Sequence, residues 1–216
     1  MGNMRFVSNA CDAPLTMFAC GHDVYHKDCI SLLHQTIVAN PDAALAFPQT
    51  FFFKDDIAQW TQRVDGMADT KGMDLTSRIN VVLWGIMHNY QFHGIYKSPA
   101  IKNIFRGNVC VGIDHLFMID VACRGSMRFV EDAHFFMRKL DDFGDGDSYL
   151  RKLKLNDRDK QAAINDFKDQ LRYLASIVVS NFPAGATRDL LLAQIVSSYL
   201  IKHGNTLNVF GYGIEV

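Results

Sequence analysis

The sequence predicts a mainly α fold, a compact helical globule with a C-terminal helical hairpin and minor β structure, with an α+β fold as the alternative. Apolar residues recur at steps of three and four in several segments, as on one face of a helix. Two long segments of this kind stand near the C-terminus, separated by a short turn with Pro183 and Gly185. Alternation typical of a strand is clearest at residues 207–214.

Two prolines, Pro41 and Pro48, mark the first break in the chain because proline interrupts a helix. The closely spaced cysteine and histidine residues precede this break, and the segments after it have mainly helical spacing. We therefore expect an N-terminal Cys/His segment over residues 1–50 and a helical body over residues 51–216.

The first part of the body is expected to hold a short helix over residues 55–64 and a longer one over residues 74–90. The apolar stretch at residues 109–123 is central to the fold, and its periodicity fits a buried strand and a buried helix equally well. Ser126 is a suitable N-cap for a further helix that ends near Leu140. One face of that helix would carry Phe129, Ala133, Phe136 and Leu140.

Two long helices are expected to close the chain as an antiparallel hairpin. Asn156 is the N-cap of the first, whose apolar seam suits packing against another helix. The second covers residues 188–203, with Thr187 before it and Gly204 as a C-terminal glycine. The connection is short, so the two helices should lie side by side. The seam of the first helix consists of Ile164, Phe167, Leu171, Leu174 and Val178.

Composition excludes several classes of protein. The chain has 216 residues, 49% of them hydrophobic and 21% charged, which is enough apolar material for a buried core and excludes disorder. The net charge of -1 creates no overall attraction to nucleic acid or to an anionic membrane. We see no apolar run long enough for a membrane span and no signal peptide. Five cysteines at uneven spacing do not suit a disulfide framework, so we expect a reducing, cytoplasmic setting.

A dense set of metal-ligand residues lies near the N-terminus. Cysteine thiolates and imidazoles are the ligands that zinc prefers, and four of them within ten residues could surround one tetrahedral ion. A further cysteine lies nine residues upstream and could replace any of the four. We therefore predict a zinc site. Its candidate ligands are Cys11, Cys20, His22, His26 and Cys29.

The string CGHDVYHKDCISLL, residues 20–33, resembles the central part of RING-H2 zinc domains, in which such cysteines and histidines precede an apolar helix. The resemblance covers residues 11–33, and the rest of the chain resembles no family that we identify. Pro14 stands where a second cysteine would follow, and no closing Cys-x2-Cys pair comes later. The resemblance implies that Cys20 and His22 serve one zinc ion and His26 and Cys29 another, with Cys11 in place of one of the first two cysteines.

The function that we expect is protein–protein interaction or assembly with further copies of the chain, with the zinc segment as a small structural knuckle. No Gly-rich phosphate loop, dinucleotide fingerprint or serine-hydrolase motif is present, which favours an accessory or virus-like assembly protein over an enzyme. The alternative is a metal-dependent hydrolase that uses His22, Asp23 and His26 with residues from elsewhere. The adjacent His22–Asp23 pair is similar to the metal pair of HD-type phosphohydrolases.

Charge is distributed unevenly along the last third of the chain. Residues 127–147 carry three basic and six acidic side chains, and residues 150–172 carry seven basic and four acidic ones. Such a charge reversal suits a protein partner or self-association. Nucleic acid is a less favoured partner, and Arg151, Lys152 and Lys154 would contact it.

Overall fold

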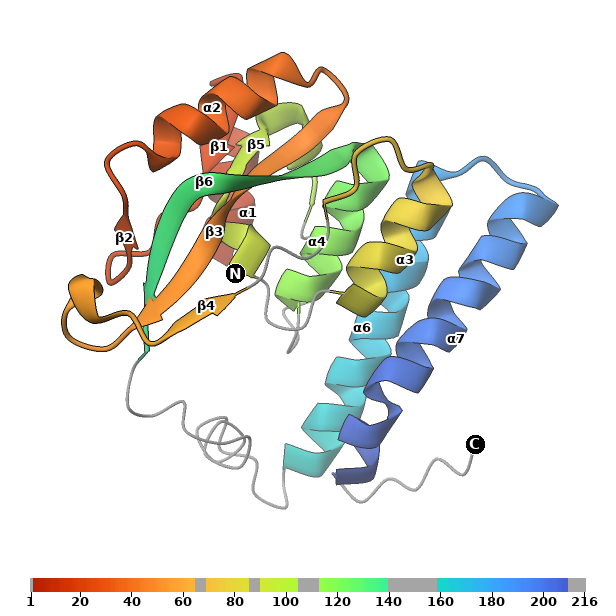
Figure 1. The fold of residues 1–216 in the computed structure, drawn as a ribbon. Helices are drawn as coiled ribbons and strands as arrows, with labels where there is room; N and C mark the ends of the chain where they lie inside the picture. The colour runs from red at the N-terminus through yellow and green to blue at the C-terminus, as the bar shows by residue number, and fades with distance from the viewer. Residues whose placement is uncertain (1, 65–68, 86–89, 105–112, 140–158, 210–216) are drawn as a thin grey trace.

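The computed structural model describes residues 2–64, 69–85, 90–104, 113–139 and 159–209 (Figure 1). In this part of the chain a mixed six-stranded sheet packs between helices, so the fold is α+β. The prediction of a mainly α fold is wrong, and the alternative class is correct. The cause lies in the two longest strands, neither of which has the simple alternation that identifies a strand in a sequence.

Strand β3 (Ala43–Phe53) lies at the centre of the sheet. It runs parallel to β6 (Ser126–Arg138) along its whole length. On its other edge it pairs antiparallel with β5 (Ile95–Lys97) near its start and with β4 (Gln62–Val64) near its end. The sheet is completed by β1 (Leu15–Met17) beside β5 and by β2 (Val24–Tyr25) beside β6.

The sequence of β3, AALAFPQTFFF, lacks alternation because every one of its residues is buried. A strand with both faces covered has no need for polar residues at every second position. Pro48 was expected to break the chain, yet it lies inside this strand. The register with β6 shifts between Pro48 and Gln49, so the proline without an N–H falls at an irregularity of the ladder.

Strand β6 occupies residues that were expected to form a helix from Ser126. Its pairing with β3 passes from Val130 directly to His134, so residues 131–133 are an insertion opposite the step from Pro48 to Gln49. The insertion interrupts the period of two, and the apolar residues around it acquire steps of three and four. The helix prediction is wrong for this reason.

Three other segments differ from their expected form or resolve an ambiguity. Within residues 55–64 the chain forms one 3₁₀ turn, η1 (Ile57–Gln59), followed by β4 instead of a longer helix. The apolar stretch is helical in α4 (Ile113–Arg124), and residues 109–112 lie outside the described residues. Residues 207–209 belong to the last helix and not to a strand, and residues 210–214 are also outside the described part.

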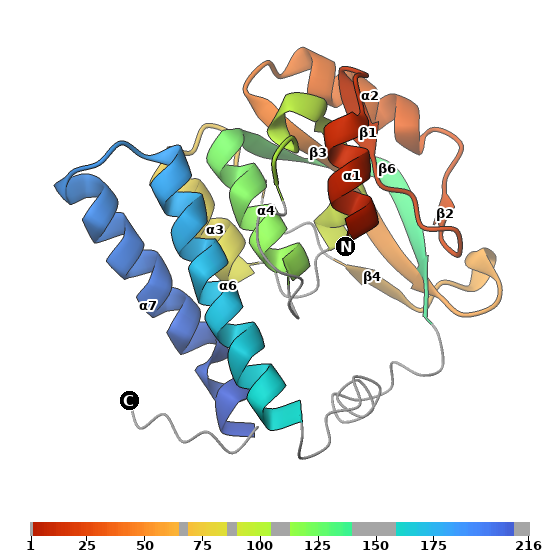
Figure 2. The same cartoon turned by 180° about the vertical axis from the view of Figure 1, so that it is seen from behind.

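Helices cover the two faces of the sheet. Helix α2 (Cys29–Ala39) packs against β3, β5 and β6 on one face, and α3 (Leu75–Gly85) and α4 lie on the other, as Figure 2 shows from behind. Helix α1 (Gly2–Ala10) lies beside the turn at residues 101–103, where the N–H of Asn103 donates to Asn9 Oδ1 at 2.9 Å. The core beneath α2 contains Cys29, Leu33, Ile37, Ala43, Ala46, Ile95 and Ala133.

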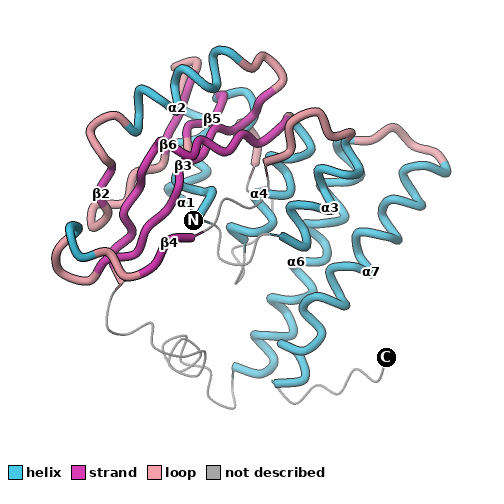
Figure 3. Tube along the Cα trace, viewed as in Figure 1, coloured by secondary structure: helices cyan, strands magenta, loops and turns pink. Residues whose placement is uncertain are grey.

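Helices α6 (Asp159–Asn181) and α7 (Ala186–Val209) form an antiparallel pair on the side of α3 and α4 away from the sheet (Figure 3). They lie where the apolar periodicity predicts a hairpin, and their buried side chains join the larger core with those of α3 and α4. The Tyr199 hydroxyl donates to Gln170 Oε1 across the pair at 2.6 Å. No helix of the described residues has the length and apolarity needed to cross a membrane.

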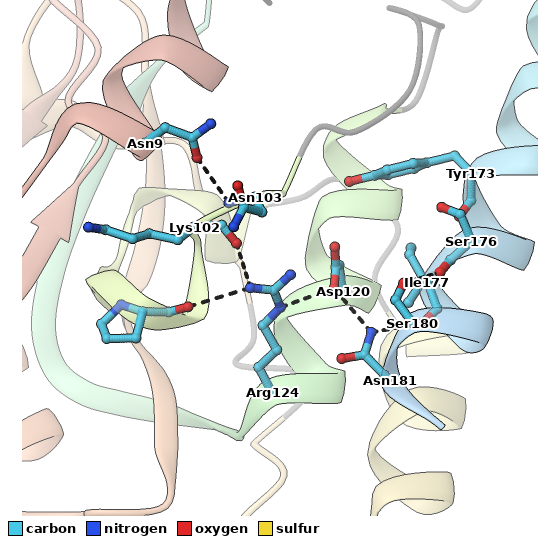
Figure 4. Close-up of polar contacts among 11 residues, drawn as sticks. Asn9, Lys102, Asn103, Asp120, Arg124, Tyr173, Ser176, Ile177, Ser180 and Asn181 are labelled. Carbon is cyan, nitrogen blue, oxygen red and sulfur yellow. Dashed lines mark hydrogen bonds and ion pairs between the residues drawn. The ribbon is translucent and has the colours of Figure 1, made fainter. Parts of the chain in front are cut away.

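A buried ion pair connects α4 with α6 and with the turn after η3 (Ser98–Ala100) (Figure 4). Asp120 is fully buried, and its Oδ1 lies 3.2 Å from Nε of Arg124 one helical turn later. Asn181 Nδ2 on α6 also donates to this oxygen, at 3.5 Å. The Arg124 guanidinium donates to the carbonyl of Lys102 at 2.6 Å, so the pair joins three segments.

Replacing Asp120 by alanine should lower the free energy of unfolding by about 3 kcal/mol, because Arg124 would keep a largely buried charge without its carboxylate. Urea denaturation measures this loss. The matched control is Arg172→Ala, which removes an exposed i,i+3 ion pair to Asp169 and should cost less than about 0.5 kcal/mol. Equal losses in the two variants would contradict the role assigned to Asp120.

Gly94 lies between η2 (Tyr90–His93) and β5, against the backbone of β3. A Cβ at this position would stand 2.3 Å from the carbonyl oxygen of Ala46 and 2.6 Å from a methyl group of Leu45. The carbonyl belongs to the central strand and cannot rotate away. Glycine is therefore required for η2 and β5 to approach β3 this closely.

The substitution Gly94→Ala should destabilise the protein by about 2 kcal/mol or more, since relief of the overlap requires a backbone shift in the sheet. Thermal or urea unfolding measures the effect. Gly21→Ala is the control, because no heavy atom lies within 4 Å of a Cβ at Gly21. An unchanged stability of Gly94→Ala would show that the contact with Ala46 is not as close as described.

Candidate metal centre

Three potential metal ligands converge between β1, β2 and η2. One ligand atom each from Cys20, Asp23 and His93 lies within 4.8 Å of the other two. Among the described residues, these three are the one group of cysteine, histidine or acidic side chains with at least three members close enough to share an ion. A thiolate, a carboxylate and an imidazole are all ligands of zinc in proteins.

The local backbone explains how these three residues meet. The N–H of Asp23 donates to the carbonyl of Cys20 at 3.4 Å, which closes a turn and brings the two side chains together. His93 is the last residue of η2, and Gly94 after it lets this segment pack against β3. The centre thus combines a tight turn with a segment that follows about seventy residues later.

The Asp23 carboxylate is buried and fixed on one side. Its side chain is 1% exposed, and Oδ1 accepts a hydrogen bond from the backbone N–H of Arg138 at 3.1 Å. His22 Nε2 lies 3.6 Å from the same oxygen. The other oxygen, Oδ2, is buried and has no hydrogen-bond partner among the described residues. A buried carboxylate oxygen without a partner costs free energy, and a bound cation would supply one.

His93 is buried, and its ring stacks on that of Phe135 with 4.5 Å between the centroids. Burial lowers the pKa of His93, the charge of Asp23 raises it and His22 lowers it. The net decrease favours the neutral imidazole, which has the free lone pair that a metal ion requires. Its Nδ1 is buried without a hydrogen-bond partner among the described residues.

Cys20 is half-buried, and burial followed by the charge of Asp23 raises its pKa. Its thiol therefore retains the proton in the metal-free protein, and metal binding would release this proton. Tyr25 lies close by: its hydroxyl is 3.5 Å from the carbonyl of His93, and burial is the main cause that raises its pKa.

The other candidate ligands lie in different surroundings. Cys29 is the first residue of α2, fully buried in the core beneath it, and burial raises its pKa to about 12. Cys11 accepts a hydrogen bond from the Thr16 hydroxyl at 3.3 Å. His26 contacts the ring of His134, with 5.9 Å between the centroids. The two-zinc arrangement implied by the RING-H2 resemblance stays a prediction.

His93 is not among the zinc ligands predicted from the sequence, in which it is only one of several histidines that an enzyme pocket could gather. It follows Phe92 and precedes Gly94, and although His88 lies five residues before it, no cysteine stands nearby to complete a zinc motif. Its contribution depends on tertiary structure, because η2 meets the turn at residues 20–23 only in the folded sheet. Asp23 was expected in the hydrolase alternative. The basic residues Arg151, Lys152 and Lys154 lie outside the described residues, and the expected protein partner or self-association stays a prediction.

Comparisons with known proteins identify a fold and no family. No protein-family model matches the chain, and no curated protein matches it. Among solved structures, the crystal structure of S. aureus TarS 1–349 is similar, with a TM-score of 0.59 and 12% sequence identity. The similarity covers 98% of this chain and 53% of that structure, so the chain spans about half of its length. At this identity the comparison supports the α+β fold alone.

The surroundings of the cysteines lead to an order of reactivity towards iodoacetamide. The pKa of Cys11 is lowered, first by the hydrogen bond from Thr16, so it forms more thiolate at neutral pH. Burial raises the pKa of both Cys29 and Cys123 to about 12, and of the four cysteines that the structure describes these two should react slowest. Peptide mass spectrometry after brief alkylation of the folded protein measures the order. Labelling of Cys29 as fast as Cys11 would contradict it.

Proposed function

We propose that the protein is a metal-dependent enzyme that binds one zinc ion through Cys20, Asp23 and His93 and uses it for hydrolysis. The convergence of these three ligand atoms is the observation that carries the proposal. Two of the residues, Asp23 and His93, each have a buried polar atom without a hydrogen-bond partner among the described residues. A cation bound through these two atoms would supply the partner that each lacks.

The donor set favours zinc over magnesium or calcium. Hard cations such as magnesium prefer oxygen ligands and retain water, whereas thiolate and imidazole are typical ligands of zinc. Three protein ligands are the number found in catalytic zinc sites, and structural sites have four. Zinc bound in this way would polarise a substrate oxygen or lower the pKa of a bound water to about 7.

The residues around the three ligands would orient them. The backbone N–H of Arg138 holds one oxygen of Asp23, and the other has no hydrogen-bond partner among the described residues. Phe135 supports the ring of His93 from one side. His22 is more than half exposed and lies next to Asp23, so it is the polar side chain best placed at the open side of the centre. Such outer contacts set the geometry and affinity of metal ligands.

A structural zinc site in an interaction protein is the second candidate. The observation that favours it is that the ligands come from two segments far apart in the sequence. An ion bound by both would cross-link the turn at residues 20–23 to η2 and would restrict the unfolded chain. The two candidates share the ligands and differ in whether removal of zinc affects catalysis or only stability.

Zinc content tests the ligand set. Protein purified without chelators should contain one equivalent of zinc, and both Cys20→Ser and His93→Ala should lose it because two ligands hold the ion weakly. Cys11→Ser is the control: it should retain zinc if the centre is as proposed and lose it if Cys11 is a ligand. Wild-type protein that binds no zinc, or His93→Ala protein that retains the full equivalent, would refute the proposal.

Activity separates the two candidates. A panel of phosphate esters, carboxylate esters and amides is assayed with the native, chelated and zinc-restored protein. Hydrolysis that disappears on chelation and returns with zinc supports the enzyme. A large decrease in Tm on chelation, with no hydrolysis in any state, would instead support the structural site.

A further inference from the structure

His26 and His134 face each other across the pairing of β2 with β6. Tyr25 lies opposite Phe135 in this antiparallel ladder, and His26 follows in the position opposite His134. The backbone N–H of His26 donates to the carbonyl of His134 at 3.0 Å. The strand register itself therefore keeps these two side chains adjacent.

The pair is separate from the metal centre. Successive side chains of a strand point to opposite faces, and Phe135 packs against His93. Its neighbour His134 therefore points to the other face, where it meets His26 with 5.9 Å between ring centroids and 60° between the ring planes. Rings at this distance can direct one nitrogen each toward a shared ion, since a zinc–nitrogen bond is about 2.0 Å long.

Both rings have support that fixes their position. Phe51 packs against the His134 ring at 5.1 Å with its plane nearly perpendicular. The Asp28 carboxylate lies 3.6 Å from Nδ1 of His26. The backbone N–H of Asp28 donates to this nitrogen at 3.4 Å, so in the metal-free protein Nδ1 is an acceptor. The carboxylate beside it would accept a hydrogen bond from Nδ1–H once an ion occupies the other ring nitrogen, as is usual beside a metal-bound histidine.

The pair is also accessible. The side chains of His26 and Asp28 are 43% and 57% exposed, and His134 is half-buried. An ion could enter and leave here without displacement of the core. This differs from the centre at Cys20, where the Asp23 side chain is almost completely buried.

We propose that His26 and His134 form a second, exchangeable site for a divalent transition-metal ion, with Asp28 as the positioning residue for His26. The ligand is a cation that prefers imidazole, namely zinc, nickel or copper, and water completes its coordination. The proposal does not depend on the function of the centre at Cys20, because the two sites share no ligand.

Copper(II) titration followed by electron paramagnetic resonance tests the site, with zinc-loaded protein so that the centre at Cys20 is filled. The wild type should show a spectrum with two nitrogen ligands, and both His26→Ala and His134→Ala should lose it and bind copper at least tenfold more weakly. Asp28→Asn should retain the two-nitrogen spectrum with affinity reduced by about tenfold. Circular dichroism verifies that the variants are folded.

The control is His34→Ala, which removes an exposed histidine of α2 outside the pair and should leave the spectrum and affinity unchanged. The titration is repeated on His93→Ala protein. A two-nitrogen spectrum that persists there assigns the signal to the pair even if the centre at Cys20 binds no metal. A wild-type spectrum without two nitrogen ligands, or its persistence in His26→Ala or His134→Ala, would overturn the proposal.

Discussion

The parallel pairing of β3 with β6 is the interaction on which the rest of the fold depends. The two strands start together: the Ser126 hydroxyl donates to the Asp42 carboxylate at 2.7 Å, and the Ser126 N–H donates to the Asp42 carbonyl at 2.9 Å. Parallel neighbours need a connection that returns to the same end of the sheet. Here that connection contains β4, α3, β5 and α4, so its helices cover one face while β4 and β5 pair with the free edge of β3.

The same pairing places both candidate metal sites. Phe135 and His134 are consecutive in β6, so they point to opposite faces, and one supports His93 while the other meets His26. The insertion at residues 131–133 sets this phase, because it determines which face each later residue occupies. Arg138 at the end of the strand then presents its N–H to Asp23. A change of one residue in the length of the insertion would reverse the faces that His134 and Phe135 occupy.

Sequence patterns predict the parts of this fold that depend on local packing. The seam through Leu171, Leu174 and Val178 places α6 correctly because a helix buries a stripe with a fixed period. The central strand could not be identified in this way, since burial of both faces removes alternation and Pro48 suggested a break. For the site, the Cys/His spacing indicates Cys20 and its neighbourhood. The same spacing does not include His93, because His93 approaches Cys20 and Asp23 only in the folded sheet.

The contrast between two buried aspartates explains why a cation suits the centre at Cys20. Asp120 has the guanidinium of Arg124 beside it and an amide of Asn181, so its charge is balanced within the protein. Asp23 is equally buried, but its partners are the backbone N–H of Arg138 and the exposed imidazole of His22 at 3.6 Å. The guanidinium of Arg138 lies over the ring of Phe53. His93 is favoured as a neutral ring and contributes no compensating charge. The negative charge of Asp23 thus lies within 4.8 Å of potential ligand atoms of Cys20 and His93, where a divalent ion would balance it.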